Sequence, residues 1–138
     1  MGINTILQEF YKGKTVLLTG ATGFKGSWLA FWLTEMGAKV IGYSLPPLTG
    51  EDHFNLLHLN DKITHIEADI LDLKKLQEVF DAHQPEIVFH LAAQVEVGVG
   101  LVNPFLTFET NVSKTMNIGY KDRPTLNYNE LFTSYILP

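Results

Sequence analysis

The sequence predicts an α/β protein built on a parallel sheet of four to five strands. Short apolar runs alternate with segments whose apolar residues recur at helical spacing, which is typical of βαβ units. One run, 86–91, is apolar almost without a break, as expected of a parallel strand covered on both faces. A glycine-rich loop separates the first apolar run from the first helical segment. The 138 residues have room for one hydrophobic core and no second domain.

The first part of the chain is expected to alternate strand, helix and strand. The apolar run 15–19 predicts the first strand. A tight turn and a helix follow, with the run 28–33 buried against the sheet and Gly37 as the C-terminal cap. Residues 38–43 predict the second strand, which ends before Pro46 because proline cannot donate to a sheet.

The middle of the chain repeats this order. Residues 48–62 are expected to be irregular, with a short helix around 54–59, and 63–68 predict the third strand. Asp72 is expected to cap a helix whose apolar residues share one face and which stops at Gln84. The fourth strand is the apolar run named above.

The last part of the chain gives weaker signals. Asn103 followed by Pro104 favours a helix start, and Gly119 can end that helix. The tail, 120–138, is polar and then aromatic, and residues 131–134 predict one more short strand.

Composition and charge exclude several classes of protein. The 10 Lys+Arg against 15 Asp+Glu give a net charge of −5 without a basic stripe, so nucleic acid and anionic membranes are not expected as partners. No apolar run approaches the roughly 18–20 residues of a membrane span. The chain has no cysteine, which removes disulfides and thiolate metal sites, and we expect no metal site. A cytoplasmic protein is expected.

The glycine-rich loop carries the strongest functional signal. Gly20, Gly23 and Gly26 follow a Gly-x-x-Gly-x-x-Gly spacing between a strand and a helix. In such loops one glycine permits the tight turn, one lets the backbone approach a pyrophosphate, and one allows close packing of the helix. Amide N–H groups at the helix start hold the negative charge. The context favours dinucleotide binding by a Rossmann-like fold over an ordinary turn.

Two segments resemble the extended short-chain dehydrogenase/reductase family. They are Thr-Gly-Ala-Thr-Gly-Phe-Lys-Gly-Ser-Trp from Thr19 and Gln-Pro-Glu-Ile-Val-Phe-His-Leu-Ala-Ala-Gln from Gln84. Within the family, the chain is similar to the nucleotide-sugar epimerases and dehydratases, and the Gly-Phe-Lys-Gly-Ser-Trp run resembles the CDP-glucose 4,6-dehydratases. The resemblance implies a lyase whose NAD oxidises the sugar at C4, after which water is eliminated across C5 and C6 and the hydride returns to C6. It implies a dinucleotide and a nucleotide sugar as partners.

The resemblance also implies a cofactor site, position by position. The pyrophosphate turn would comprise Gly20, Gly23, Phe24, Lys25 and Gly26, with Thr22 and Ser44 also assigned to the cofactor site. Asp69 and Ile70 match an adenine-contacting pair, and Leu91, Ala92 and Ala93 match small residues beside the nicotinamide half. Thr110 and Asn111 match a Thr-Asn pair whose asparagine supports the active site.

Simpler interpretations of several residues stay open. Asp69 could be a solvated loop residue, and 91–93 could be ordinary core. His90 is better explained as a hydrogen-bonded core histidine. NAD rests on the resemblance alone, because neither a carboxylate nor an arginine stands near Ser44 in the sequence, and NADP is not excluded.

The chain departs from the family in its last third. Members use a Tyr-x-x-x-Lys pair in which the lysine lowers the pKa of the tyrosine, and none of the five tyrosines here has a lysine four residues later. Ser134 falls where the family keeps a catalytic serine or threonine, but Tyr135 and Ile136 replace the acid and base after it. We therefore assign 1–119 to a truncated dinucleotide-binding Rossmann domain and 120–138 to a diverged tail.

Three hypotheses follow from these matches and departures. The chain is the cofactor-binding portion of a nucleotide-sugar 4,6-dehydratase and is inactive alone. Alternatively, it is a non-catalytic dinucleotide-binding or oligomerisation module, a homo-oligomer that covers a bare sheet edge. In a third hypothesis, another chain completes an active reductase.

Overall fold

The structure, a computed structural model, describes residues 2–93, 101–105, 111 and 131–133. Its parallel sheet has the strand order β3-β2-β1-β4-β5. The strands are β1 (Thr15–Thr19), β2 (Lys39–Ser44), β3 (Thr64–Glu67), β4 (Ile87–His90) and β5 (Leu131–Thr133). The predicted fold class is confirmed.

The strand order reverses direction at β1. From β1 the chain winds outward through β2 to β3 and then returns to place β4 on the other side of β1. Because all the strands are parallel, their carboxyl ends meet at one edge of the sheet. In open α/β sheets, ligands bind outside the carboxyl ends of the strands at such a switch point.

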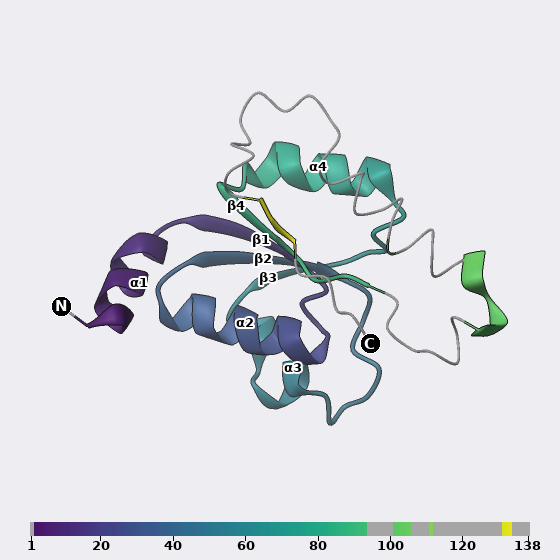
Figure 1. Cartoon of the computed structure of the whole chain (residues 1–138), viewed down its shortest axis with the longest axis horizontal. Coiled ribbons are helices and arrows are strands. Elements are labelled where there is room, and N and C mark those ends of the chain that lie inside the picture. The colour runs from purple at the N-terminus through teal and green to yellow at the C-terminus, as the bar shows by residue number, and fades with distance from the viewer. Residues whose placement is uncertain (1, 94–100, 106–110, 112–130, 134–138) are drawn as a thin grey trace.

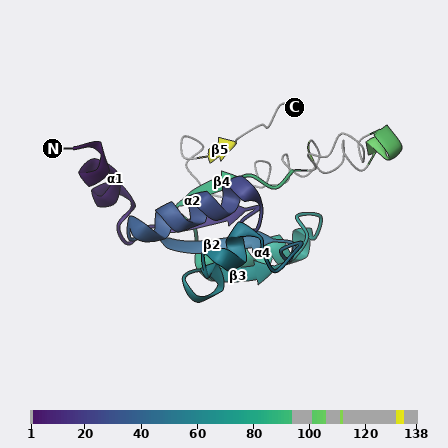
Figure 2. The ribbon, with the colours of Figure 1, turned by 90° about the horizontal axis from the view of Figure 1, so that it is seen from below.

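Helices cover both faces of the sheet (Figure 1). One face carries α2 (Phe24–Glu35), the short α3 (His53–Leu56) and the 3₁₀ turn η1 (Leu59–Asp61), and the other carries α4 (Leu73–His83). Seen from below, α2 runs in front of the strands (Figure 2). A further helix, α1 (Ile3–Tyr11), precedes β1 and lies beyond the end of the sheet.

Alternate side chains of the strands fill two cores. Val16 and Leu18 of β1 pack on the face of α2, with Leu33, while Leu17 packs on the face of α4, with Leu76. All of these side chains are almost fully buried. This two-sided burial explains why the central strands are continuous apolar runs rather than alternating ones.

The predicted helix ends agree with the observed caps. The Asp72 carboxylate accepts from the Lys75 N–H at 2.9 Å, and α4 ends where Gln84 adopts a left-handed φ of 45°. At the end of α2, Gly37 has a φ of +81°. The helix expected around 54–59 is instead divided into α3 and η1, because the left-handed His58 between them, with φ 50°, interrupts a helical path.

The expectation that the whole run 28–33 is buried is wrong. On α2, Ala30 and Leu33 face the sheet and are fully buried, whereas Trp28 is 40% exposed and Trp32 is 62% exposed. A helix lying on a sheet can bury only the side that faces it. Because apolar residues lie on all sides of this helix, its sequence does not show which side faces the sheet.

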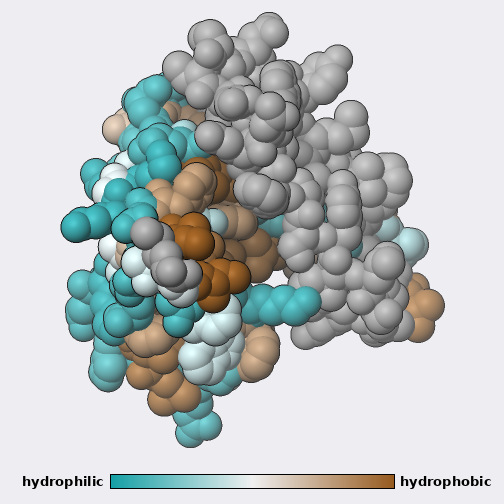
Figure 3. Space-filling model, turned by 60° about the vertical axis from the view of Figure 1, so that its left-hand side comes forward, coloured by the Kyte–Doolittle hydropathy of each residue, from teal (hydrophilic) through white to brown (hydrophobic). Residues whose placement is uncertain are grey.

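Sequence reasoning missed α1, although its signal is present. Ile3, Ile6, Leu7 and Phe10 recur at helical spacing, so they share one side of the helix. Their side chains are between 39% and 73% exposed. Figure 3 shows apolar side chains gathered at this end of the molecule. The helix therefore adds no buried residue to either core.

Only parts of the last third are described. Pro104 and Phe105 are helical after Asn103, as predicted, and the rest of that helix lies outside the described residues. β5 agrees with the short strand predicted at 131–134, but Ser134 lies outside the described part. None of the helices described is long and apolar enough to cross a membrane.

Candidate functional site

The loop between β1 and α2 turns sharply at Gly20. This residue has a φ of +74°, a conformation that glycine adopts without strain. Its N–H donates to the Tyr43 carbonyl at 3.0 Å. A Cβ added to Gly20 would lie 2.8 Å from the backbone nitrogen of Ala92. A side chain here would therefore collide with the segment that leaves β4.

Gly26 brings α2 against the same turn. A Cβ on Gly26 would overlap the Gly20 carbonyl oxygen and lie 2.8 Å from the Gly20 carbonyl carbon. At Gly23 the added Cβ would lie 3.3 Å from that oxygen, a tight but tolerable contact. Backbone contacts thus require glycine at positions 20 and 26, and require it far less at position 23.

The first turn of α2 presents amide groups to an anion. Gly23 is the N-cap and has no side chain to accept from them, and the Ser27 N–H donates to the Gly23 carbonyl at 2.9 Å. The N–H groups of Phe24, Lys25 and Gly26 precede that bond and have no acceptor within the helix. The Lys25 side chain is exposed beside them. This combination of amides, helix dipole and lysine suits a pyrophosphate.

The segment that leaves β4 lies against the glycine turn. The Leu91 N–H donates to the Thr19 carbonyl at 3.1 Å, and the Ala92 N–H donates to the Thr19 hydroxyl at 3.3 Å. Leu91 and Ala92 are half-buried and pack against the two cores, whereas Ala93 is exposed. The simpler interpretation of this segment as ordinary core therefore fits Leu91 and Ala92 and does not fit Ala93.

β2 ends beside the turn at Ser44, which is only 6% exposed. The Ser44 hydroxyl and His65 Nε2 are 2.9 Å apart. Burial lowers the pKa of His65 while Glu67 opposes that shift, so the ring is neutral at pH 7. The Thr22 hydroxyl donates to the Leu45 carbonyl at 2.9 Å and so joins the glycine turn to the residue after β2.

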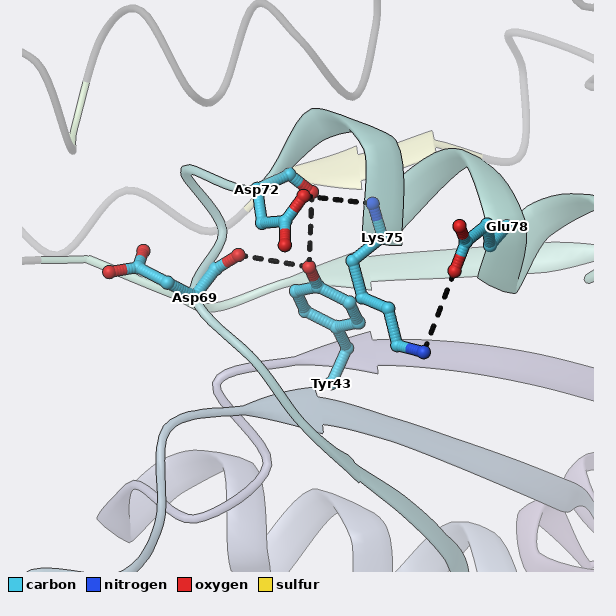
Figure 4. A network of polar contacts seen from close by, with 5 residues as sticks. All are labelled: Tyr43, Asp69, Asp72, Lys75 and Glu78. Carbon is cyan, nitrogen blue, oxygen red and sulfur yellow. Dashed lines mark hydrogen bonds and ion pairs between the residues drawn. The ribbon is translucent and has the colours of Figure 1, made fainter.

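A buried tyrosine holds the loop after β3 (Figure 4). The Tyr43 hydroxyl donates to the carbonyl oxygens of Asp69 at 2.9 Å and Asp72 at 3.3 Å. Burial raises the pKa of Tyr43 to about 12, and the two aspartates add to the rise. The Asp69 carboxylate points away from Tyr43 and accepts from the Leu71 N–H at 2.9 Å. Asp69 is therefore part of an organised, half-buried loop next to the buried Ile70.

Removing the Tyr43 hydroxyl should loosen this loop. Tyr43→Phe is expected to lower the free energy of unfolding by about 1 kcal/mol, since the ring is retained and only the hydrogen bonds are lost. Urea unfolding measures the change, with Tyr11→Phe in α1 as the matched control. If the free energy of unfolding falls no more in Tyr43→Phe than in the control, the Tyr43 hydroxyl does not stabilise this loop.

The structure brings most of the predicted site residues to one place. The carboxyl ends of β1, β2 and β4 and the start of α2 converge at the switch point. Asn111 is half-buried, but Thr110 and Ser134 lie outside the described residues. Sequence reasoning missed four residues that shape the site: Thr19, Tyr43, His65 and, in its pairing role, His90. Their signal was a polar group inside or at the end of a predicted strand.

Comparison with known proteins identifies the family. A family model described as GDP-mannose 4,6 dehydratase matches residues 17–119, which is most of the chain. The chain belongs to this family. The resemblance to nucleotide-sugar dehydratases and epimerases predicted from the glycine turn is thereby confirmed.

Curated relatives of this GDP-mannose 4,6-dehydratase family member include a dehydratase and an epimerase. The chain is 46% identical to a CDP-glucose 4,6-dehydratase of Salmonella typhimurium, over 80% of the chain and 31% of that enzyme. It is 36% identical to a UDP-glucose 4-epimerase of Mycoplasma genitalium, over 75% of the chain and 30% of that enzyme. The chain therefore spans about a third of the length of these relatives.

Solved structures of epimerases share the fold of this family member. An epimerase from Methanothermobacter thermautotrophicus superposes with a TM-score of 0.72 and 31% identity, over 84% of the chain and 33% of its own. A UDP-glucose 4-epimerase from Brucella ovis, solved in complex with NAD, gives a TM-score of 0.65 and 27% identity, over 77% and 31%. The part matched is thus an N-terminal Rossmann portion.

The described ranges contain no group of three or more His, Asp or Glu side chains that could hold a metal ion.

Proposed function

We propose that this chain binds a dinucleotide, NAD, at the switch point of its sheet, as the cofactor-binding portion of a nucleotide-sugar dehydratase or epimerase. The proposal rests on the close backbone contacts at Gly20, in the loop between β1 and α2, and at Gly26, in the first turn of α2. Gly20 and Gly26 lie so close to neighbouring backbone that no side chain fits at either position. An ordinary turn needs neither contact, whereas in a dinucleotide-binding turn the first glycine allows the tight turn and the third allows close packing of the helix whose N-terminus meets the pyrophosphate.

The bound dinucleotide would lie across the carboxyl ends of the strands. Its pyrophosphate would accept from the amides of Phe24, Lys25 and Gly26. Ser44 would lie beside the adenosine ribose, and the adenine amino group would donate to Asp69. The nicotinamide half would lie against the Leu91, Ala92 and Ala93 backbone. We assign residues 1–119 to this dinucleotide-binding domain and 120–138 to a diverged tail.

NAD is proposed over NADP because of the surroundings of Ser44. The 2′-phosphate of NADP is held by a cation such as arginine. Ser44 is instead paired with the neutral ring of His65, and Glu67 lies opposite Ser44 in the register of β2 and β3. A carboxylate at that position disfavours an added phosphate. The Brucella ovis relative solved with NAD supports the same choice.

Calorimetry of the full chain with NAD, NADP and CDP-glucose, each alone, tests the proposal. We expect heat from NAD, weaker binding of NADP, and little from CDP-glucose. Lys25→Gln is expected to weaken NAD binding about fivefold, the effect of about 1 kcal/mol for an exposed ion pair. Lys39→Gln, at the other end of β2, changes the net charge equally and should leave the affinity unchanged. Absence of NAD binding by the unaltered chain would refute the proposal.

Catalysis is not part of this proposal. None of the tyrosines in the 138 residues has a lysine four positions later, so the chain lacks the pair that would remove the sugar hydroxyl proton. We propose that it binds the cofactor without turning over CDP-glucose or another nucleotide sugar. Formation of a 4-keto-6-deoxy product at an ordinary enzymatic rate would contradict this.

Self-association also stays a proposal. The exposed apolar side of α1, formed by Ile3, Ile6, Leu7 and Phe10, favours a homo-oligomer over a monomer. Light scattering that gave a monodisperse monomer at high concentration would overturn it. The cytoplasmic location predicted from composition stays a prediction as well.

A further inference from the structure

Two buried polar side chains face each other where β1 and β4 end. Thr19 and His90 are register partners in the parallel pair, and they are 0% and 3% exposed. The Thr19 hydroxyl oxygen lies 2.6 Å from Nδ1 of His90, a short distance for a neutral pair. Burying a polar side chain costs free energy unless it is hydrogen-bonded, so each of these two side chains depends on the other as a partner.

The Thr19 hydroxyl has one proton and two acceptor positions, so it can take part in both contacts at once. Its oxygen accepts from the Ala92 N–H at 3.3 Å and shares a hydrogen bond with Nδ1 of His90, in which the donor depends on which ring nitrogen carries the proton. Burial lowers the pKa of His90 to about 4, so the ring is neutral at pH 7.

The same threonine connects both sides of the candidate site. Thr19 immediately precedes Gly20, whose missing Cβ would meet Leu91 and Ala92. Its carbonyl accepts from the Leu91 N–H and its hydroxyl accepts from the Ala92 N–H. The glycine turn and the 91–93 segment are therefore joined through Thr19, and His90 holds the hydroxyl of that residue in place.

We propose that Thr19 and His90 are positioning residues that set the spacing between the glycine turn and the 91–93 segment. This inference rests on the proposed function, in which the turn takes the pyrophosphate and the segment takes the nicotinamide half. Neither side chain needs to touch the ligand. Their effect would appear only for a ligand that spans both parts, which separates positioning from a general loss of stability.

A first measurement needs no ligand. Thr19→Val keeps the shape of the side chain and removes the hydroxyl, and Thr19→Ser retains the hydroxyl as the matched control. Hydrogen exchange of the Ala92 amide is expected to accelerate at least about tenfold in Thr19→Val, since a half-buried N–H loses its partner, and to stay near the unaltered rate in Thr19→Ser. Unchanged exchange at Ala92 in Thr19→Val would overturn the proposal whether or not the chain binds a dinucleotide.

A second measurement compares two ligands by calorimetry. NAD spans the turn and the segment, whereas ADP reaches only the turn. Thr19→Val and His90→Leu are expected to weaken NAD about tenfold and ADP less than about threefold. His90→Asn, whose amide oxygen can accept from Thr19, should restore NAD binding and serves as a second test if Thr19→Val does not fold.

Each outcome of the ligand comparison has a meaning. Equal losses for NAD and ADP would show a merely structural role and overturn the proposal, as would unchanged NAD binding in both variants. If the unaltered chain binds neither ligand, the proposed function fails. The exchange rate of the Ala92 amide then decides alone whether Thr19 positions the 91–93 segment.

Discussion

Gly26→Ala is expected to lower the free energy of unfolding by about 3 kcal/mol, at the upper end of the usual cost of overpacking, and to abolish NAD binding. The added methyl group would overlap the Gly20 carbonyl oxygen, and both contacting atoms belong to backbone that cannot rotate away. Relief requires α2 to move off the turn. Its first amide groups would then no longer converge on a pyrophosphate.

Gly23→Ala is the matched control for that substitution. Its Cβ would meet the same oxygen at 3.3 Å, three residues earlier in the same loop. We expect a loss of less than about 1 kcal/mol in the free energy of unfolding. Urea unfolding measures this loss in both variants, and calorimetry measures NAD binding by Gly26→Ala. Equal losses in the two variants would show that glycine at position 26 serves flexibility and not contact.

The second large effect is a loss of stability in mild acid. His90 has a pKa of about 4 in the fold, against 6.5 for an unperturbed histidine, because it is buried. The unfolded chain therefore binds the proton at higher pH than the folded chain does. Stability contributed by the neutral ring is complete above pH 6.5 and is lost as the pH falls toward 4, by on the order of 3 kcal/mol.

His90→Asn isolates this term, because it keeps a hydrogen-bonding group and cannot titrate there. The other titratable groups, His65 included, are common to both proteins and cancel in the difference. We expect the unaltered chain to lose more stability than His90→Asn over this range, measured by urea unfolding at several pH values. Parallel curves would mean that His90 is not the buried neutral group described.

The strands could be predicted from the sequence because their signal is local. The run 15–19 coincides with β1, and the other three predicted strands in the first 93 residues differ from the observed ones by a residue at each end. Apolar runs between turn residues are enough for that purpose. Asp72 and Gln84 were likewise predictable at the ends of α4, since capping depends on neighbouring residues.

The parts that could not be predicted depend on contacts between distant residues. Nothing in the local sequence shows that Trp28 and Trp32 face solvent while Ala30 faces the sheet, because that requires knowing where the sheet lies. The pairing of Thr19 with His90 joins residues 71 positions apart. The glycine spacing predicted a turn, but the reason that Gly20 must be glycine lies in Ala92.

The central position of β1 also bears on how the chain folds. β1 is synthesised first among the strands, yet its second neighbour, β4, lies 71 residues further along. Closing so long a loop is entropically costly and slows folding. Until Ile87–His90 has left the ribosome, β1 stays open on one side, with unpaired backbone groups that can join a strand of another chain. Protection of the nascent chain by chaperones therefore matters most in this interval of synthesis.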